Sequence, residues 1–372
     1  MRNRDNSGAD QAFIRAHNAQ AALRALRYAG DPTTLSQLAK TAGLSRPTVE
    51  SVLADLTARG WAEELPPDDG AMGRPARRFR FHAAAGYAVG LDIGMRKALA
   101  IVTDLGGHVV ATRRCTLGDD LPGPDRLQRA GDLVDECLQQ AKLAPSALWA
   151  LTVGLPGLMD RGGRMTRSTV LPGLTGVNLS GYFNGRFGCP VNAENDANLA
   201  TLAEHWRGCA RHIDDVVYIL AGRRTGAGMI VGGQLHRGPN GAAGEIGNLR
   251  MLGWWDAPGD LESHGADAEA VFGAAQTDAA AREAVLAYAN ALANGISALV
   301  LTLDPDLVVV GGGLSRAGDQ LLRPLRDRLA ELCLTTPRLE VSALGDESVA
   351  LGAVRTSLDH IDQEVFEAGL QL

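Results

Sequence analysis

The sequence predicts an α/β protein in two parts: a small helical head with a two-stranded hairpin over residues 1–82, and a larger body of alternating strands and helices over residues 83–372. The charge divides at the same place. Residues 1–82 carry 12 Lys and Arg against 9 Asp and Glu, whereas the remainder carries 24 against 34. The body also repeats one order of strands, turns and loops, which indicates a duplicated unit. A basic head on an acidic body favours a protein whose head binds a polyanion.

Three short helices are predicted in the head. Apolar residues recur at helical spacing over residues 18–28, a second helix follows over 35–42, and a third begins after the capping residue Ser45 and ends before Gly60. The turn between the last two helices is typical of helix-turn-helix spacing. Near the start of the third helix, where DNA-reading helices contact base edges, lie four polar residues: Ser45, Arg46, Thr48 and Ser51.

An arginine-rich segment separates two predicted strands, residues 61–64 and 79–82. It places four arginines within seven residues, 74–80. For this segment alone, a solvated loop that happens to be positive is the alternative interpretation. Three helices, a Gly-containing turn and a basic hairpin in this order resemble the winged helix-turn-helix of many bacterial regulators. We therefore expect operator DNA as a partner, with Arg74, Arg77 and Arg78 binding phosphates.

Composition excludes several classes of protein. The chain is 45% hydrophobic and 21% charged, which is typical of globular proteins rather than disordered or fibrous ones. No uninterrupted apolar run approaches the roughly 20 residues that span a bilayer, and the polar N-terminus is unlike a signal peptide, so we expect a cytoplasmic protein without membrane contact. The five cysteines lie far apart without a CxxC pair, which predicts reduced, buried thiols rather than disulfides or metal ligands.

The body begins with a strand at 87–93 that carries Asp92 near its end. Strands at 97–103 and 108–116 and a helix at 125–142 follow. A similar order returns later, with a strand at 216–220, a Gly-rich loop, a strand at 228–231 and a third short strand. Two such units facing each other would place Asp92, Asp196 and the second Gly-rich loop near one opening.

The junction at residues 190–198 is the centre of this body. An extended segment stops there and a helix starts, with Asn195 and Asp196 at the boundary. These residue types commonly cap helices by accepting hydrogen bonds from the first turn, and capping alone is one interpretation. The other is ligand binding, because ligands of open α/β sheets lie just beyond the carboxyl ends of strands. A carboxylate there can accept a hydrogen bond or a proton from a hydroxyl group.

Three motifs together resemble the ROK family of repressors, uncharacterised reading frames and sugar kinases. They are the Asn-Asp-Ala-Asn of residues 195–198, the Gly-Pro-Asn-Gly-Ala-Ala-Gly-Glu-Ile-Gly-Asn of 238–248 and the Leu-Asp-Pro-Asp-Leu-Val-Val-Val-Gly-Gly-Gly of 303–313. The likeness covers residues 86–358, and the Gly-Arg-Pro head is similar to that of the repressor branch. The resemblance implies an actin-like (ribonuclease H-like) ATPase fold of two lobes. It also implies a sugar-binding set: Asn195, Asp196, Glu245, Asn248 and Glu262.

Departures from the family pattern predict lost functions. The resemblance implies a zinc held by one His and three Cys, but those positions read Asn248, Gly253, Trp255 and Asp260, so we expect no metal. Met95 and Arg224 add bulk in the two loops where kinase members have glycines, so we expect no nucleotide cofactor and no catalysis. The arginine could in principle bind a phosphate directly.

We therefore expect a regulator, most simply a repressor of carbohydrate uptake or metabolism genes, that binds a sugar or sugar derivative and acts as a homodimer or homotetramer. One alternative is an ATP-dependent sugar kinase with a regulatory head, in which Asp196 is the base. Another is a regulator controlled by a protein partner without a small ligand.

Overall fold

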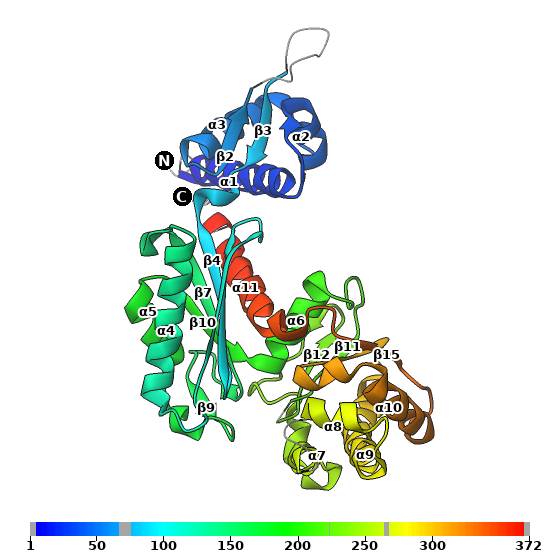
Figure 1. Cartoon of the computed structure of the whole chain (residues 1–372). Coiled ribbons are helices and arrows are strands. Elements are labelled where there is room, and N and C mark those ends of the chain that lie inside the picture. The colour runs from blue at the N-terminus through cyan, green and yellow to red at the C-terminus, as the bar shows by residue number, and fades with distance from the viewer. Residues whose placement is uncertain (1–4, 67–75, 223, 264–267, 368–372) are drawn as a thin grey trace.

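The computed structural model describes residues 5–66, 76–222, 224–263 and 268–367. A head stands on one end of a two-lobed body, and helix α11 runs from the region between the lobes up to the head (Figure 1). The predicted fold class, a small helical head ahead of an α/β body of two lobes, is confirmed.

The head consists of three helices and a small sheet in the order β1-β3-β2. Its elements are α1 (Asp5–Arg27), β1 (Thr33–Thr34), α2 (Leu35–Ala42), α3 (Arg46–Ala58), β2 (Ala62–Leu65) and β3 (Arg78–Phe81). Thr34 and Gln37 form a capping box on α2, and Gly43 ends that helix at φ +67°, a conformation that favours glycine. Ser45 caps α3 by accepting from the Thr48 amide, as the sequence predicts.

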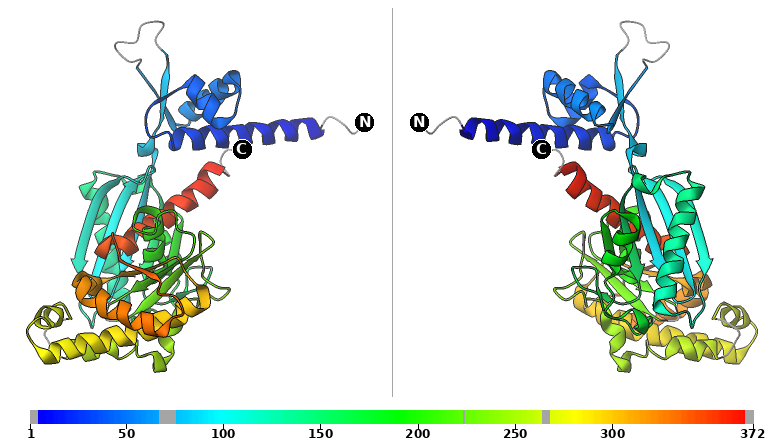
Figure 2. Two further views of the ribbon diagram at one scale, coloured as in Figure 1. Left: turned by 90° about the vertical axis from the view of Figure 1, so that its right-hand side faces the viewer. Right: turned by 90° about the vertical axis from the view of Figure 1, so that its left-hand side faces the viewer.

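Two details of the predicted head are wrong. Helix α1 begins at Asp5 rather than at residue 18, and its N-terminal part projects away from the rest of the head (Figure 2). The apolar pattern marked only the part of this helix that packs against a core, where Ala22, Leu23 and Leu26 are buried. Ala29, which fits the same helical spacing, lies beyond the end of the helix and is exposed. The two-residue strand β1 was also missed, because it is too short for a periodic signal.

The first lobe is built on a five-stranded sheet in the order β10-β7-β4-β5-β6, in which β4, β5 and β6 are antiparallel and β7 and β10 run parallel to β4. Helices α4 and α5 cover its outer face. The elements of this lobe are β4 (Tyr87–Ile93), β5 (Lys97–Asp104), β6 (Val109–Thr116), α4 (Gly123–Gln140), β7 (Leu148–Leu155), β8 (Leu158–Met159), β9 (Met165–Arg167), α5 (Leu179–Phe187) and β10 (Val191–Asn195).

The second lobe repeats this topology. Its sheet has the order β13-β12-β11-β14-β15, with the first three strands antiparallel and the last two parallel to β11, so the predicted duplication is confirmed. The elements are α6 (Asp196–Arg207), β11 (Val216–Leu220), β12 (Gly226–Val231), β13 (Gln234–Leu235), α7 (Ala257–Glu262), α8 (Ala268–Ala274), α9 (Ala279–Leu303), β14 (Leu307–Gly311), α10 (Asp319–Leu332), β15 (Arg338–Val341) and α11 (Ser348–His360).

Short 3₁₀ or π segments connect these elements: η1 (Ala83–Ala85), η2 (Pro145–Ala147), η3 (Pro172–Leu174), η4 (Glu245–Asn248), η5 (Arg250–Leu252), η6 (Gly313–Ala317), η7 (Gly345–Glu347) and η8 (Ile361–Glu367). Helices α6 and α11 lie between the two sheets and bury apolar residues against both. They cross closely at Gly352, where an added Cβ would lie 1.8 Å from the carbonyl oxygen of Leu199. Only glycine allows this approach.

Helix α9 is long and apolar enough to cross a membrane by length and composition, a feature that the search for uninterrupted apolar runs missed. Most of its apolar window is buried, in a core formed with the second sheet, α8 and α10. Helix α9 is therefore a core helix of the second lobe.

One apolar cluster joins the head to the body. It contains Leu23 and Leu26 of α1 together with Leu105 and, from the C-terminal helices, Leu358 and Ile361. Arg27 strengthens the junction, because it pairs with Asp362 and donates to the carbonyl oxygen of Leu105 at 2.9 Å. The C-terminal end of the body is therefore packed into the base of the head.

Candidate functional site

Strand β10 ends and helix α6 begins at the edge of the first sheet, which places Asn195 and Asp196 at a cavity between the lobes. Asn195 is the N-cap. Its Oδ1 accepts from the Asn198 amide at 3.1 Å, and its Nδ2 donates to the carbonyl oxygen of Gly157 at 3.2 Å. Asp196 uses Oδ1 to accept from the Ala197 amide at 2.9 Å. Asn195 therefore has a structural role, whereas Asp196 keeps a carboxylate oxygen for a ligand.

This first cavity brings together four residues of the predicted sugar-binding set: Asn195, Asp196, Glu245 and Asn248. Glu245 and Asn248 lie at the two ends of η4, and the side-chain Nδ2 of Asn248 donates to Glu245 Oε2 at 3.0 Å. Burial raises the pKa of Glu245, and the hydrogen bond from Asn248 opposes that shift. The fifth residue, Glu262, ends helix α7, and its side chain lies outside the described part of the chain.

A second cavity of about 750 Å³ adjoins the first one. Asp92 lines it near the end of β4, as the duplicated-unit argument predicts, and Asp196 lines both cavities. Burial raises the pKa of Asp92 to about 7, which Lys97 opposes and Asp196 reinforces. Burial also raises the pKa of Asp196, to about 6. A carboxylate with a pKa in this range can exchange a proton with a hydroxyl near neutral pH.

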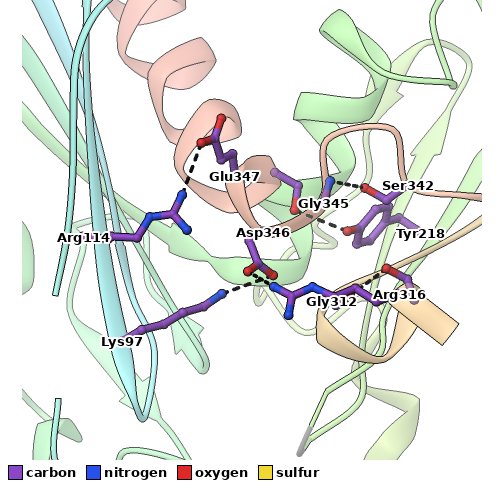
Figure 3. Close-up of polar contacts among 11 residues, drawn as sticks. Lys97, Arg114, Tyr218, Gly312, Arg316, Ser342, Gly345, Asp346 and Glu347 are labelled. Carbon is purple, nitrogen blue, oxygen red and sulfur yellow. Dashed lines mark hydrogen bonds and ion pairs between the residues drawn. The ribbon is translucent and has the colours of Figure 1, made fainter. Parts of the chain in front are cut away.

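An ionic cluster that no sequence motif marks lies beside the second cavity, and three of its members, Lys97, Arg316 and Asp346, line that cavity (Figure 3). Asp346 of η7 pairs with Lys97 of the first lobe at 3.4 Å and with Arg316 of the second. Its neighbour Glu347 pairs with Arg114 of β6 at 3.4 Å. These partners lie far apart in the sequence, so only the folded chain reveals that they connect the lobes.

A second contact that was not predicted joins β10 to the start of the loop that carries Glu245. Glu194, on β10, accepts from the amide of Asn195 at 2.9 Å and from Asn198 Nδ2 at 3.0 Å through one oxygen. Its other oxygen pairs with Arg237, which lies on the second lobe just before the Gly-rich loop. The one feature of the sequence that could have pointed to Glu194 is its position directly before Asn195.

The residues at the zinc positions do not fit a zinc ion. Asn248 is engaged with Glu245, and Trp255 presents a ring and no ligating atom. Within the described ranges, no group of three or more His, Cys, Asp or Glu side chains has a metal-site arrangement. Trp254 is buried and donates to the carbonyl oxygen of Leu292 at 3.3 Å, so packing against α9 anchors this loop.

Arg126 anchors the loop after β4 by hydrogen bonds to its backbone. This buried side chain donates to the carbonyl oxygens of Gly94 at 2.9 Å and of Met95 at 2.6 Å. Met95 and Arg224 both line the second cavity, where the resemblance puts nucleotide phosphates. In phosphate-binding loops, backbone amides contact the phosphates directly. The Met95 and Arg224 side chains obstruct such contacts here, so these two loops do not fit the phosphates of a nucleotide.

On the DNA-reading side of the head, Arg46 and Ser51 are exposed on α3, while the Ser45 and Thr48 hydroxyls bond each other at 2.7 Å. In the hairpin, Arg77 donates to Glu64 at 2.6 Å through Nη2 and lies 3.6 Å from Glu50. These pairs are exposed and therefore weak, so phosphates can displace them. Arg78 donates to the carbonyl oxygen of Pro66 at 3.5 Å. Arg74 lies outside the described residues.

Comparisons with known proteins agree with this two-part architecture. The ROK family model matches residues 88–258 and 254–359, and the IclR helix-turn-helix domain model matches residues 17–66. A xylose repressor from Bacillus subtilis (strain 168) is 24% identical over 95% of this chain and 97% of its own length. A glucokinase from Halalkalibacterium halodurans is 26% identical over 72% of this chain and 93% of its own length.

Among solved structures, a ROK family transcriptional regulator that is a homolog of the E. coli MLC protein superposes with a TM-score of 0.72. It is 18% identical and covers 96% of this chain and 98% of that chain. At this identity the likeness concerns the fold: a helix-turn-helix head on a body of two related lobes.

Proposed function

Because this chain belongs to the ROK family and carries a helix-turn-helix domain ahead of the family body, we propose that it is a sugar-responsive, DNA-binding transcriptional repressor. Its targets are genes of carbohydrate uptake or metabolism. A relative named xylose repressor matches 95% of this chain, which supports this assignment.

The observation that carries the proposal is the continuous path from the cleft to the head. Helix α6 starts at Asp196 and packs along α11, crossing it at Gly352. The first residues of α11, Ser348 and Val349, line the second cavity, while its far end enters the apolar cluster beneath α1 (Figure 1). A ligand that changes the separation of the lobes therefore acts on α6 and α11, and α11 continues to the base of the head. It can shift DNA affinity only by binding the two lobe arrangements with different affinity.

A sugar suits the first cavity because carboxylate oxygens can each accept hydrogen bonds from hydroxyl groups, and Asp196 and Glu245 face the same space. Truncating one such carboxylate leaves hydroxyl groups unpaired at a cost of about 1 to 3 kcal/mol, which corresponds to roughly 5- to 150-fold in affinity.

The second candidate function is a sugar kinase, and one observation favours it: Asp92 and Asp196 are both retained at the cavity where the kinases of the family act. We propose that catalysis is nevertheless absent. Phosphoryl transfer depends on positioning the phosphates, and Met95 and Arg224 stand in the two loops that would position them.

The protein acts in the cytoplasm as a homodimer or homotetramer, since paired heads read paired half-sites on DNA. Control by a protein partner alone, without a small ligand, is the third candidate.

Operator binding in the presence of sugars tests the proposal. An operator is first selected from random duplex DNA, and its affinity for the full chain is then measured by fluorescence anisotropy with sugars, amino sugars, oligosaccharides and sugar phosphates. We expect at least one ligand to change operator affinity several-fold, and Glu245→Ala to weaken that ligand at least 5-fold. No effect of any ligand would favour control by a protein partner. Steady ATP-dependent phosphorylation that Asp196→Asn abolishes would favour the kinase.

A further inference from the structure

The two cavities adjoin each other, and seven of the described residues line both of them. Among these are Asp196, Arg224 and Trp255. A sugar bound in the first cavity with a hydroxyl on Asp196 would therefore have the adjoining part of its ring directed toward the second cavity. A substituent at that position enters a space of about 750 Å³ that an unmodified sugar leaves empty.

Basic side chains line this second space, and most of them already have carboxylate partners. Arg96 pairs with Asp119 at 3.0 Å, and Lys97 and Arg316 both pair with Asp346. Arg224 differs from them, because in the described part of the chain no carboxylate contacts it.

Arg224 is also held in place. Its Nη1 donates to the carbonyl oxygen of Trp255 at 3.0 Å, and its guanidinium carbon lies 4.2 Å from the centre of the Trp255 ring. Stacking on an aromatic ring restricts the guanidinium group without using its remaining N–H donors. A restricted arginine loses less side-chain entropy when it binds, and its planar fork matches the two oxygens of a carboxylate or phosphate.

A guanidinium group can donate to a neutral hydroxyl, but its hydrogen bonds to a carboxylate or phosphate are stronger because the acceptor is charged. The acids and amides of the first cavity can bind hydroxyl groups. At the border of the second cavity, a guanidinium that no described carboxylate contacts favours a negative charge. We propose that the ligand of this cleft is a sugar with an anionic substituent, a phosphate ester or a carboxylate, which Arg224 binds at the junction of the two cavities. This inference rests on the proposed sugar-responsive function and names the ligand class of the same site.

The test compares matched pairs of ligands by isothermal titration calorimetry with the full-length protein. Glucose, mannose, galactose and N-acetylglucosamine are each compared with their 6-phosphate and 1-phosphate, and the three hexoses also with their uronic acids. We expect at least one acidic member to bind at least 10-fold more tightly than its neutral parent. The phosphate and uronic acid arms distinguish the two sources of negative charge.

Variants locate the effect. Arg224→Met keeps an unbranched side chain against Trp255 but removes the charge, so it should weaken the acidic ligand at least 10-fold and change the neutral parent by less than about 3-fold. Arg250→Met is the matched control, because Arg250 lies 3.9 Å from the centre of the same ring but lines neither cavity. It should leave both affinities unchanged.

The inference is overturned if no acidic sugar binds more tightly than its parent, or if Arg224→Met leaves the preference intact. Binding of ADP together with a neutral sugar would also overturn it, because the anion of the second cavity would then belong to a nucleotide. If neutral sugars bind and change operator affinity without any preference for acids, only this inference fails. If no sugar of either kind binds, the proposed function fails with it.

Discussion

Replacing Arg27 by methionine should uncouple the cleft from the head. The side chain of Arg27 is 12% exposed and that of its partner Asp362 is 25% exposed, so the pair is largely shielded from water. Arg27→Met leaves the Asp362 carboxylate and the Leu105 carbonyl oxygen without this donor. Breaking a fully buried pair costs about 3 to 5 kcal/mol, and partial exposure reduces this to about 1 to 3 kcal/mol.

That loss is similar in size to the coupling free energy of a typical allosteric protein, about 1 to 3 kcal/mol. Fluorescence anisotropy with the selected operator should therefore show that an effective ligand changes the affinity of the wild-type protein at least 5-fold and that of Arg27→Met less than 2-fold. Ligand affinity in the absence of DNA should be nearly unchanged, because Arg27 lines neither cavity. Arg15→Met, at an exposed position of the same helix, is the control. A full ligand response in Arg27→Met would refute the coupling route through the α1 junction.

Three further predictions concern the head, the chemistry and the pH dependence. Arg77→Ala combined with Arg78→Ala should flatten the dependence of operator affinity on salt by about 0.9 in log–log slope for each phosphate that the variant no longer neutralises, and an unchanged slope would exclude the hairpin as a phosphate-binding element. Wild-type protein should show no sugar-dependent turnover of ATP in a coupled assay, because Met95 and Arg224 stand in the phosphate loops; turnover that Asp196→Asn abolishes would show otherwise. The raised pKa of Asp92, about 7, means that the folded state binds more protons than the unfolded state between pH 4 and 7, so stability falls as the pH rises through that range. Between pH 5 and pH 8 the free energy of unfolding of Asp92→Asn should therefore rise relative to that of wild type by roughly 1 kcal/mol or more. Urea unfolding at several pH values measures this, and the same pH dependence of the unfolding free energy in both proteins would contradict it.

The helices and strands that have a periodic apolar pattern could be predicted from the sequence. Helices α2 and α3 and the strands around Asp92 follow from apolar periodicity and from local capping at Ser45, which are properties of neighbouring residues. The extended start of α1 could not be predicted in this way, because its first turns carry no apolar stripe toward a core.

The candidate site also has one part that could be predicted from the sequence and one part that could not. Asn195, Asp196, Glu245 and Asn248 were found because they lie in short motifs, and the fold brings them to one cavity. The ion pairs of Asp346 and the pair between Glu194 and Arg237 could not be predicted, since each joins segments that only the packing of the two lobes brings together. The same holds for Arg27 and Asp362, which are separated by 335 positions in the chain.

Thermodynamic reciprocity gives the most direct test of the central claim that occupation of the cleft is communicated to the DNA-binding head. The dissociation constant of an effective ligand is measured by calorimetry with the free protein and with the protein saturated by operator DNA. Linkage requires the operator to change ligand affinity by the same factor by which the ligand changes operator affinity, at least 5-fold here. Identical ligand dissociation constants with and without the operator would contradict the account.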